Sequence, residues 1–282
     1  MKICVVGLGL IGGSVCMALK RAGYTVFGAN RSQKPLTYAL NNGIIDGVAE
    51  EFDGFDLTFV CLPPEACAEF INSTEFKDGS IVSDICGVKK WIEDEVYSKP
   101  RNFKFVGTHP MAGKEVSGVE NACADLFDNA SLIITNTRKS DISAVQLIKK
   151  LAKEMGFGRV VECSAEVHDR KIAYTSQLAH IVSNAYVKDR EIDCCLGFTG
   201  GSFQDMTRIA GVDETVWASL YLKNKRNVCE KLSSVINSLE EIKSAVELGD
   251  KAELEALLKN GRTIFEESKT VKENGDIKIT VL

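Results

Sequence analysis

The 282-residue sequence predicts an α/β fold, with an N-terminal doubly wound sheet over residues 1–163 and an all-helical domain over residues 164–282. Two observations support this prediction. Short β-rich runs alternate with helical stretches up to Cys163, and strand signals nearly vanish after that residue. The alternation favours a parallel sheet with helices on its faces. The change from alternating strand-like and helical patterns to helical spacing alone marks a domain boundary at residues 163–164.

The N-terminal half contains seven candidate strands separated by polar or helical connectors. Helical spacing of apolar residues predicts a first helix over residues 14–22. Residues 141–155 form a second clear helix pattern, with Gly156 as its stop signal and apolar positions at Val145, Ile148, Leu151 and Met155. The strands are expected over residues 2–6, 25–29, 57–62, 80–85, 103–107, 131–135 and 159–163.

The C-terminal half has helical periodicity. Ser164 is expected to cap a long helix that runs through His168, Ser176 and His180. Asp250 and Glu253 resemble a capping arrangement for a last helix. These helices carry more apolar face than one small domain buries alone, so we expect a homodimer through this domain. The apolar positions are Leu232, Val235, Ile236, Leu239, Ile242 and Val246 in one helix and Leu254, Leu257, Leu258 and Phe265 in the last.

Composition excludes several classes of protein. No run of about 18 apolar residues is present, which argues against a membrane span, and the N-terminus lacks a signal-peptide layout. The formal charge of −5 argues against a nucleic-acid partner. The ten cysteines form no C-x-x-C pair and no ligand-like cluster, so we expect no metal, structural thiols and a reducing cytoplasm.

A glycine-rich loop follows the first predicted strand and opens the first helix. Residues 7–12 read Gly-Leu-Gly-Leu-Ile-Gly, the G-x-G-x-x-G pattern of a Rossmann-like dinucleotide-binding domain. Its glycines allow a tight turn, close approach of the pyrophosphate and close helix packing, and the phosphates meet N–H groups at the helix N-terminus. The cofactor-binding residues expected here are Gly7, Gly9, Leu10, Ile11 and Gly12.

The end of the second predicted strand indicates which nicotinamide cofactor binds. Enzymes that use NAD usually place an acid there, whereas this chain has Asn30, Arg31 and Ser32. A neutral Asn30 does not repel a 2′-phosphate, and Arg31 and Ser32 have groups that bind one, so NADP is favoured over NAD. The alternative is that Arg31 only stacks on the adenine and tolerates either cofactor. Cys61, Leu62 and Pro63 are assigned to cofactor binding as well.

Residues 107–118 contain the principal catalytic candidate. The segment reads Gly-Thr-His-Pro-Met-Ala-Gly-Lys-Glu-Val-Ser-Gly and places His109, one of only three histidines, in a turn after an apolar strand-like run. A histidine in a loop beside a redox cofactor indicates proton transfer coupled to hydride transfer.

Four segments together resemble the prephenate/arogenate dehydrogenase family of tyrosine biosynthesis. They are the loop at 7–12, the turn at 107–118, S-x-L-x-H at 176–180 and the GSFQDMTRIA run at 201–210. Trp217, Asn224, Lys225 and Asn227 continue the similarity, which covers nearly the whole chain. The resemblance implies a nucleotide domain, a helical domain that dimerises and an active site between them. It also implies oxidative decarboxylation of prephenate to 4-hydroxyphenylpyruvate, or of arogenate to tyrosine.

The chemistry of that reaction assigns roles to individual residues. A neutral imidazole at His109 accepts the proton of the cyclohexadienol hydroxyl as hydride leaves the same carbon. The substrate is a small anion with one or two carboxylates, which calls for a bidentate cation, and Arg208 fits that role. Ser176 and His180 are four residues apart and share one helix face, and the resemblance places His180 at the substrate. Thr108 and Gly113 complete the expected substrate site.

The sequence departs from the family pattern at several positions. Where the family often has D-x-G-S-V-K, residues 84–89 lack the serine, and Gly87 takes its place. Gln204 and Gln177 stand where a basic residue and a histidine are common, which leaves room for arogenate with its ammonium group. We expect His168 with Asp169 to be structural. The chain ends before the regulatory domain that some relatives append, so no tyrosine inhibition through such a domain is expected.

Two alternatives to this function remain open on the sequence alone. A β-hydroxyacid dehydrogenase of similar layout favours a catalytic lysine on the first helix of the helical domain, where Lys171 lies, but leaves the turn at 107–118 unexplained. A non-catalytic dinucleotide sensor keeps the loop at 7–12 but has no need of His109 or Arg208.

Overall fold

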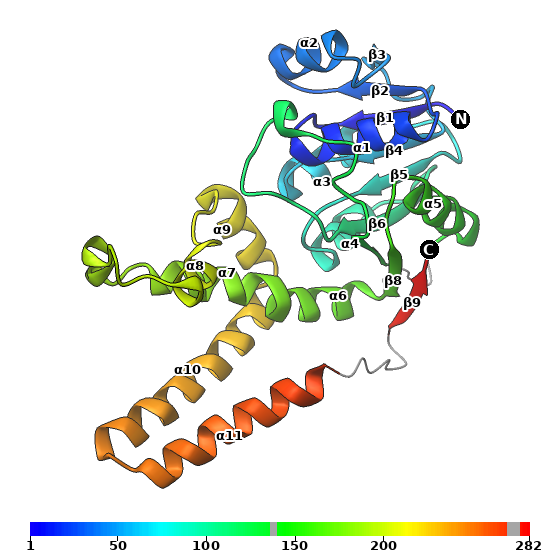
Figure 1. Cartoon of the computed structure of the whole chain (residues 1–282). Helices are drawn as coiled ribbons and strands as arrows, with labels where there is room; N and C mark the ends of the chain where they lie inside the picture. The colour runs from blue at the N-terminus through cyan, green and yellow to red at the C-terminus, as the bar shows by residue number, and fades with distance from the viewer. Residues whose placement is uncertain (136–139, 270–276) are drawn as a thin grey trace.

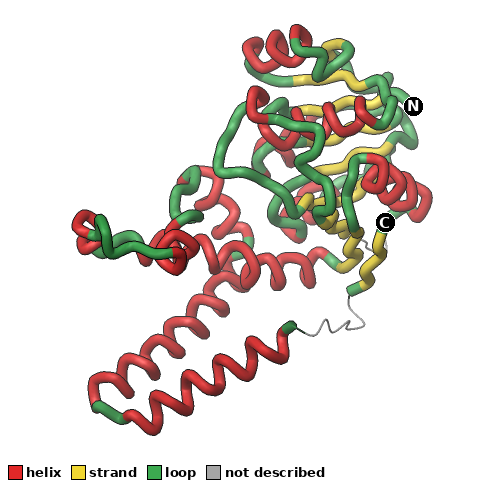
Figure 2. The backbone as a smooth tube through the Cα atoms, viewed as in Figure 1, coloured by secondary structure: helices red, strands yellow, loops and turns green. Residues whose placement is uncertain are grey.

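The computed structural model describes residues 1–135, 140–269 and 277–282, which form a sheet domain and a helical domain (Figures 1 and 2). The fold class predicted from the sequence is confirmed. The sheet strands are β1 (Ile3–Val6), β2 (Val26–Ala29), β3 (Gly47–Val48), β4 (Leu57–Val60), β5 (Ile81–Asp84), β6 (Lys104–Pro110), β7 (Ser131–Thr135), β8 (Arg159–Cys163) and β9 (Lys278–Val281).

The nine described strands form one sheet in the order β3-β2-β1-β4-β5-β6-β7-β8-β9. The strands from β3 to β6 pair in parallel, and the chain turns from one side of β1 to the other between β2 and β4. A doubly wound sheet binds ligands at such a switch point, at the carboxyl ends of its strands. The expectation of a parallel sheet is wrong at two places, because β7 runs antiparallel to β6 and β9 runs antiparallel to β8.

Helices cover both faces of the sheet, as the doubly wound pattern requires. In β1, Ile3 and Val5 pack into one apolar cluster and Cys4 and Val6 into another on the opposite face. This division follows from the two-residue period of a strand. The first face is covered by α1 (Leu10–Arg21), α2 (Gln33–Asn41) and α5 (Ile142–Glu154), and the second by α3 (Pro64–Ser73) and α4 (Lys90–Val96).

The helical domain begins directly after β8. The hydroxyl of Ser164 accepts a hydrogen bond from the N–H of Val167 at 3.3 Å, which confirms the predicted cap. The predicted long helix is present as α6 (Ala165–Ile172) and α7 (Leu178–Tyr186), joined by a π-helical turn (Ala173–Gln177). The chain continues through a 3₁₀ turn (Arg190–Cys194), α8 (Gly201–Thr207), α9 (Glu214–Lys223), α10 (Lys225–Leu248) and α11 (Lys251–Ser268).

The long helices α10 and α11 form an antiparallel hairpin that projects away from the sheet domain (Figure 1). Asp250 caps α11 by accepting a hydrogen bond from the N–H of Glu253 at 3.0 Å, as the sequence predicted. Among the described helices, none combines the length and apolar character that a membrane crossing needs.

The last described segment corrects the expectation that residues 164–282 are all helical. Residues 278–281 form β9, which pairs antiparallel with β8 at the sheet edge (Figure 1). The chain end therefore returns to the N-terminal domain. Pairing with β8 satisfies backbone groups that a four-residue strand cannot satisfy alone.

Candidate active site

The glycine loop at residues 7–12 connects β1 to α1 in the geometry that a dinucleotide needs. Gly7 has φ of +92°, and a Cβ atom there would collide with the carbonyl oxygen of Cys61. A Cβ at Gly12 would collide with the carbonyl oxygen of Gly7, whereas one at Gly9 would meet nothing within 4 Å. The open side of Gly9 and the N-terminus of α1, which no side chain caps, form a cradle that fits a pyrophosphate.

The end of β2 lies beside this loop. The side-chain oxygen of Asn30 accepts a hydrogen bond from the N–H of Leu8 at 3.0 Å, so Asn30 fixes the loop. Arg31 and Ser32 are exposed. A cavity of about 690 Å³ is lined by the predicted residues Asn30, Arg31, Ser32, Leu62 and Pro63, together with Ala66, Glu69, Phe70 and Ser73 of α3. The structure thus brings five of the predicted cofactor residues to one cavity, whereas Cys61 and the loop at residues 7–12 do not line it.

His109 lies near the carboxyl end of β6 and lines a second cavity of about 420 Å³. The sheet domain contributes Gly87 and the segment from His109 to Gly113. The helical domain contributes the opposite wall, which includes Ser176, Gln177, His180 and Trp217. The ring edge with Nε2 faces Gly87, since a Cβ atom built at Gly87 would lie 3.8 Å from Nε2.

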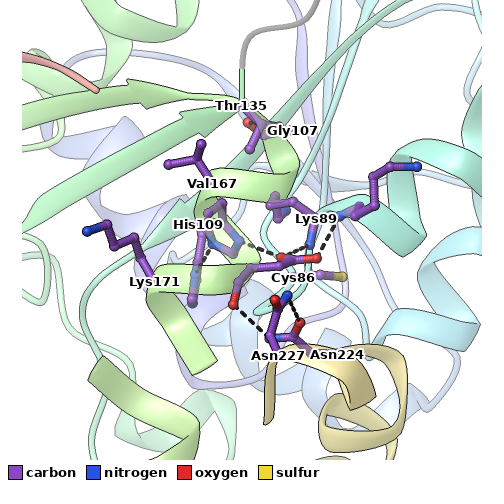
Figure 3. A network of polar contacts seen from close by, with 12 residues as sticks. Cys86, Lys89, Gly107, His109, Thr135, Val167, Lys171, Asn224 and Asn227 are labelled. Carbon is purple, nitrogen blue, oxygen red and sulfur yellow. Dashed lines mark hydrogen bonds and ion pairs between the residues drawn. The ribbon is translucent and has the colours of Figure 1, made fainter. Parts of the chain in front are cut away.

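Three side chains, the first of which is that of His109 in the cavity wall, form a line of hydrogen bonds (Figure 3). Nδ1 of His109 lies 2.9 Å from Nε2 of His168, and Nδ1 of His168 lies 2.7 Å from Oδ1 of Asp169. An ionised carboxylate only accepts, so Nδ1 of His168 donates to it, and Nε2 of His168 is then an acceptor in the neutral ring. His109 therefore donates from Nδ1, and the lone pair on its Nε2 faces the cavity.

A buried ion pair supports the backbone on which His109 sits. Lys89 and Asp84 form this pair with both side chains fully buried, and Nζ of Lys89 also donates to the carbonyl oxygen of Thr108 at 2.6 Å. Asp84 in turn accepts from the N–H of Cys86 at 2.9 Å. These contacts fix the residue before His109 and the turn that carries Gly87.

The electrostatic surroundings of His109 keep its ring neutral. Burial of the ring lowers the pKa of His109 well below 6.5, and the neighbouring His168 and the Lys89 cation lower it further. Burial also lowers the pKa of His168, although Asp169 opposes this effect. A neutral imidazole with a lone pair on Nε2 is the form that acts as a general base.

Ser176, Gln177 and His180 are positioned by the π-helical turn and the start of α7. Nδ1 of His180 donates to the carbonyl oxygen of Ile209 at 2.9 Å, and its ring packs on Trp217 with a centroid separation of 3.9 Å. Nε2 of His180 then donates to a ligand carboxylate only when the ring is protonated. Gln177 is buried and accepts a hydrogen bond from Asn224 at 2.7 Å.

Arg208 lines an adjoining cavity of about 560 Å³, which shares Gly113, His180 and Trp217 with the cavity at His109. Its guanidinium pairs with Glu115 at 2.8 Å and is 63% exposed. The cation thus lies next to the cavity at His109 but not in its wall.

Thr108 is not placed as the sequence predicted. Its side chain is buried, and its hydroxyl donates to the carbonyl oxygen of Asp84 at 2.5 Å, so Thr108 acts on the backbone and lies outside the cavity wall. Lys171 has an exposed side chain and also lies outside both cavity walls.

Sequence reasoning did not single out Lys89 and Leu220, while Asp169 was expected to be structural. Lys89 and Asp169 are buried and charged, and Leu220 lines the cavity. The run from Asp84 to Lys89 carried a signal, since an acid and a lysine five residues apart flank a turn after a buried strand. Leu220 had no signal beyond helical spacing.

Comparison with known proteins identifies the family. Residues 15–162 match the prephenate dehydrogenase nucleotide-binding domain, and residues 164–260 match the prephenate dehydrogenase dimerization domain. The chain is 31% identical to the prephenate dehydrogenase of Bacillus subtilis, over 88% of this chain and 71% of that protein. It is 27% identical to the cyclohexadienyl dehydrogenase of Zymomonas mobilis, over 86% of this chain and 88% of that protein.

A solved structure gives the same result. The prephenate dehydrogenase of A. aeolicus, crystallised with hydroxyphenyl propionate and NAD⁺, superposes with a TM-score of 0.82 and 29% identity. The match covers 95% of this chain and 98% of that one. This chain therefore belongs to the prephenate dehydrogenase family of oxidoreductases.

Proposed function

We propose that this protein catalyses the NAD(P)-dependent oxidative decarboxylation of prephenate to 4-hydroxyphenylpyruvate, or of arogenate to tyrosine, with His109 as the base. One observation carries the proposal. The hydrogen bonds from His109 to His168 and from His168 to Asp169 leave the lone pair of His109 Nε2 facing a cavity between the two domains. A cyclohexadienol hydroxyl in that cavity gives its proton to Nε2.

The remaining chemistry requires little more from the protein. The nicotinamide cofactor, when bound, supplies the hydride acceptor. Loss of the ring carboxylate as CO₂ is driven by aromatisation of the substrate. The side chains therefore bind the substrate and hold it with its hydroxyl at His109, and correct positioning of this kind accounts for a large part of a rate enhancement.

Substrate binding is assigned to Arg208, His180, Ser176 and Gly113. Arg208 binds the carboxylate of the side chain, and it does so by exchanging its bond to Glu115 for a stronger, bidentate bond to the ligand. His180 and Ser176 line the cavity at His109 and contact the substrate between the base and the cation. Thr108 is left out of this set because its hydroxyl is bonded to the backbone.

The cofactor is proposed to be NADP in preference to NAD. In support, the residues at the end of β2 carry no carboxylate, and Arg31 and Ser32 are exposed beside the cavity of about 690 Å³. An arginine and a hydroxyl bind a 2′-phosphate, which an acid at Asn30 would repel.

The assembly is proposed to be a homodimer formed through the helical domain. Leu239 and Val246 on α10 and Leu258 and Phe265 on α11 are between 58% and 61% exposed. Apolar surface of this kind marks an interaction site. Sedimentation at micromolar concentration is expected to give a dimer, and a monomer would contradict the proposal. The ten free cysteines accord with a reducing compartment, and we place the protein in the cytoplasm.

The proposed reaction is tested by a substrate comparison. The purified protein is assayed for reduction of NADP⁺ and NAD⁺ with prephenate, with arogenate and with a 3-hydroxyacid. We expect turnover with one or both of the cyclohexadienols and none with the hydroxyacid. Turnover of the hydroxyacid alone would show a β-hydroxyacid dehydrogenase, and no turnover with any substrate would favour a dinucleotide sensor.

A further inference from the structure

The contact between His109 and His168 links the cavity to a fully buried charged centre. His168 belongs to α6, 59 residues after His109, and its side chain is 0% exposed. It lines neither the cavity at His109 nor the one at Arg208. His168 therefore acts on the reaction only through His109.

The carboxylate of Asp169 is held in place from several sides. Its Oδ1 accepts from the N–H of Lys89 at 2.8 Å and its Oδ2 from the N–H of Lys90 at 3.0 Å, both at the N-terminus of α4. Asn224, at the start of α10, donates to its backbone carbonyl at 2.8 Å. Such contacts orient the carboxylate toward His168.

Positive charge is disfavoured at both rings, but less strongly at His168 than at His109. The ring of His109 is partly buried in the cavity wall, lies near the Lys89 cation and is bonded to no carboxylate among the described residues. His168 is also buried and also faces Lys89, but Asp169 is bonded to it and Asp84 adds a second negative charge nearby. An imidazolium is therefore more stable on His168 than on His109.

We propose that His168 receives the proton that the reaction delivers to His109, so that the two histidines work as a relay beside the fixed carboxylate of Asp169. The inference rests on the proposed function of His109 as base. The substrate hydroxyl transfers its proton to Nε2 of His109, and Nδ1 of His109 releases its own proton to Nε2 of His168. His109 ends neutral in the other tautomer, and His168 ends as an imidazolium bonded to Asp169, which stays ionised.

The relay resets by the reverse movement after the product leaves. Nε2 of His168 returns its proton to Nδ1 of His109, and Nε2 of His109 gives its proton to water in the emptied cavity. No oxidant or further reactant is needed. The positive charge formed during oxidation therefore lies on His168, next to the carboxylate of Asp169, and not on His109 in the cavity wall.

The variant His168→Gln separates this relay from a merely structural role. The introduced amide oxygen still accepts from Nδ1 of His109 and keeps its tautomer, but it cannot take up a proton. We expect kcat to fall about 10- to 100-fold with little change in the KM for substrate. Tyr174→Phe, at an exposed position in the adjoining π-helical turn, is the matched control and should leave kcat unchanged.

The pH profile and the solvent isotope effect are the readouts that a structural role would not move. In the wild type, the two histidines titrate as one unit. The fall of kcat/KM at acid pH (its acid limb) reports the apparent pKa of this pair. His168→Gln leaves only His109, whose pKa is lower, so the limb moves to lower pH. The proton inventory in mixtures of H₂O and D₂O should change from curved to linear. Asp169→Asn keeps an acceptor for His168 but removes the charge, and it should also move the limb to lower pH.

A measurement without substrate tests the relay separately from the proposed function. Ring ¹⁵N shifts of the three histidines, assigned by substitution, should show that His168 takes up a proton before His109 as the pH falls. Protonation of His109 first would overturn the relay, as would a kcat within twofold of wild type and an unmoved acid limb in His168→Gln. Absence of turnover by the wild type would instead overturn the proposed function.

Discussion

Gly87 and His109 lie next to each other in the wall of the cavity between the domains. A Cβ atom at Gly87 would lie 3.8 Å from Nε2 of His109 and 3.5 Å from Cδ2 of Leu220, and both distances are ordinary van der Waals contacts. The site therefore has room for a small side chain directly beside the proposed base.

Gly87→Ser should increase kcat/KM several-fold, because the hydroxyl adds a hydrogen bond to the reacting oxygen of the substrate next to Nε2. The thermal midpoint should change little, since the side chain meets no close contact. Gly87→Ala is the control, because it fills the same space without a hydroxyl. A loss of kcat/KM in the serine variant equal to that in the alanine variant would contradict the prediction.

Arg208→Gln should mainly raise the KM for substrate, by about tenfold or more, with a smaller effect on kcat. The reason is that the guanidinium binds a carboxylate and lies outside the wall that holds the base. Steady-state kinetics measure both constants. Stability should be nearly unchanged, since the pair with Glu115 is exposed on both sides and such pairs contribute little. A fall in kcat with unchanged KM would show that Arg208 acts on the reacting atoms instead.

Asn30→Asp should shift the cofactor preference from NADP toward NAD. The introduced carboxylate still accepts from the N–H of Leu8, so the loop is kept, but it repels a 2′-phosphate and accepts from a 2′-hydroxyl. We expect the ratio of kcat/KM for NADP⁺ to that for NAD⁺ to fall about tenfold or more. Arg31→Ala should lower the same ratio without improving NAD⁺. An unchanged ratio in both variants would show that Asn30 and Arg31 do not contact the 2′-position of the cofactor's ribose.

The stability of the protein should fall as the pH drops below about 6.5, the ordinary pKa of histidine. His109 and His168 have lowered pKa values in the folded state, so the unfolded chain takes up protons first and is favoured in this range. The full stability is present above pH 6.5. Each histidine contributes a loss of at most about 1.4 kcal/mol per pH unit.

Urea unfolding at several pH values and one protein concentration measures this dependence. His109→Gln removes one of the two titrating groups and should flatten the slope between pH 6.5 and 5. His180→Gln is the comparison, because the ring of His180 lies outside the buried pair. An equal slope in wild type and His109→Gln would contradict the assignment of a lowered pKa to His109.

Local patterns predicted much of this structure. The two-residue period of β1, the glycines at residues 7–12 and the helical spacing within α5 are short-range signals, so this strand, this loop and this helix appear close to where the sequence placed them. Ser176 and His180 line the same cavity because four residues make one helical turn. His109 was found because histidines are few and this one follows an apolar strand-like run, although it lies within β6 and not in a turn after it.

Other features depend on contacts that a local pattern does not contain. Strand direction has no periodic signal, so the antiparallel pairing of β7 with β6 was not predicted. Residues 278–281 become a strand only by pairing with β8, more than 100 residues earlier. The contact of His168 with His109 and the burial of Lys89 against Asp84 likewise arise from the packing of separate elements. The position of Arg208 beside the cavity at His109, and not in its wall, depends on the shape of two adjoining cavities, which the sequence does not show.

The central claim is that His109 is the base, and the rate of cofactor reduction in His109→Asn tests it most directly. A single turnover with saturating prephenate or arogenate, followed by stopped-flow absorbance of NADPH, measures the chemical step apart from product release. We predict a fall of about 10²- to 10⁴-fold with substrate affinity nearly kept. A rate close to that of the wild type would contradict the account, because proton removal would then not depend on this imidazole.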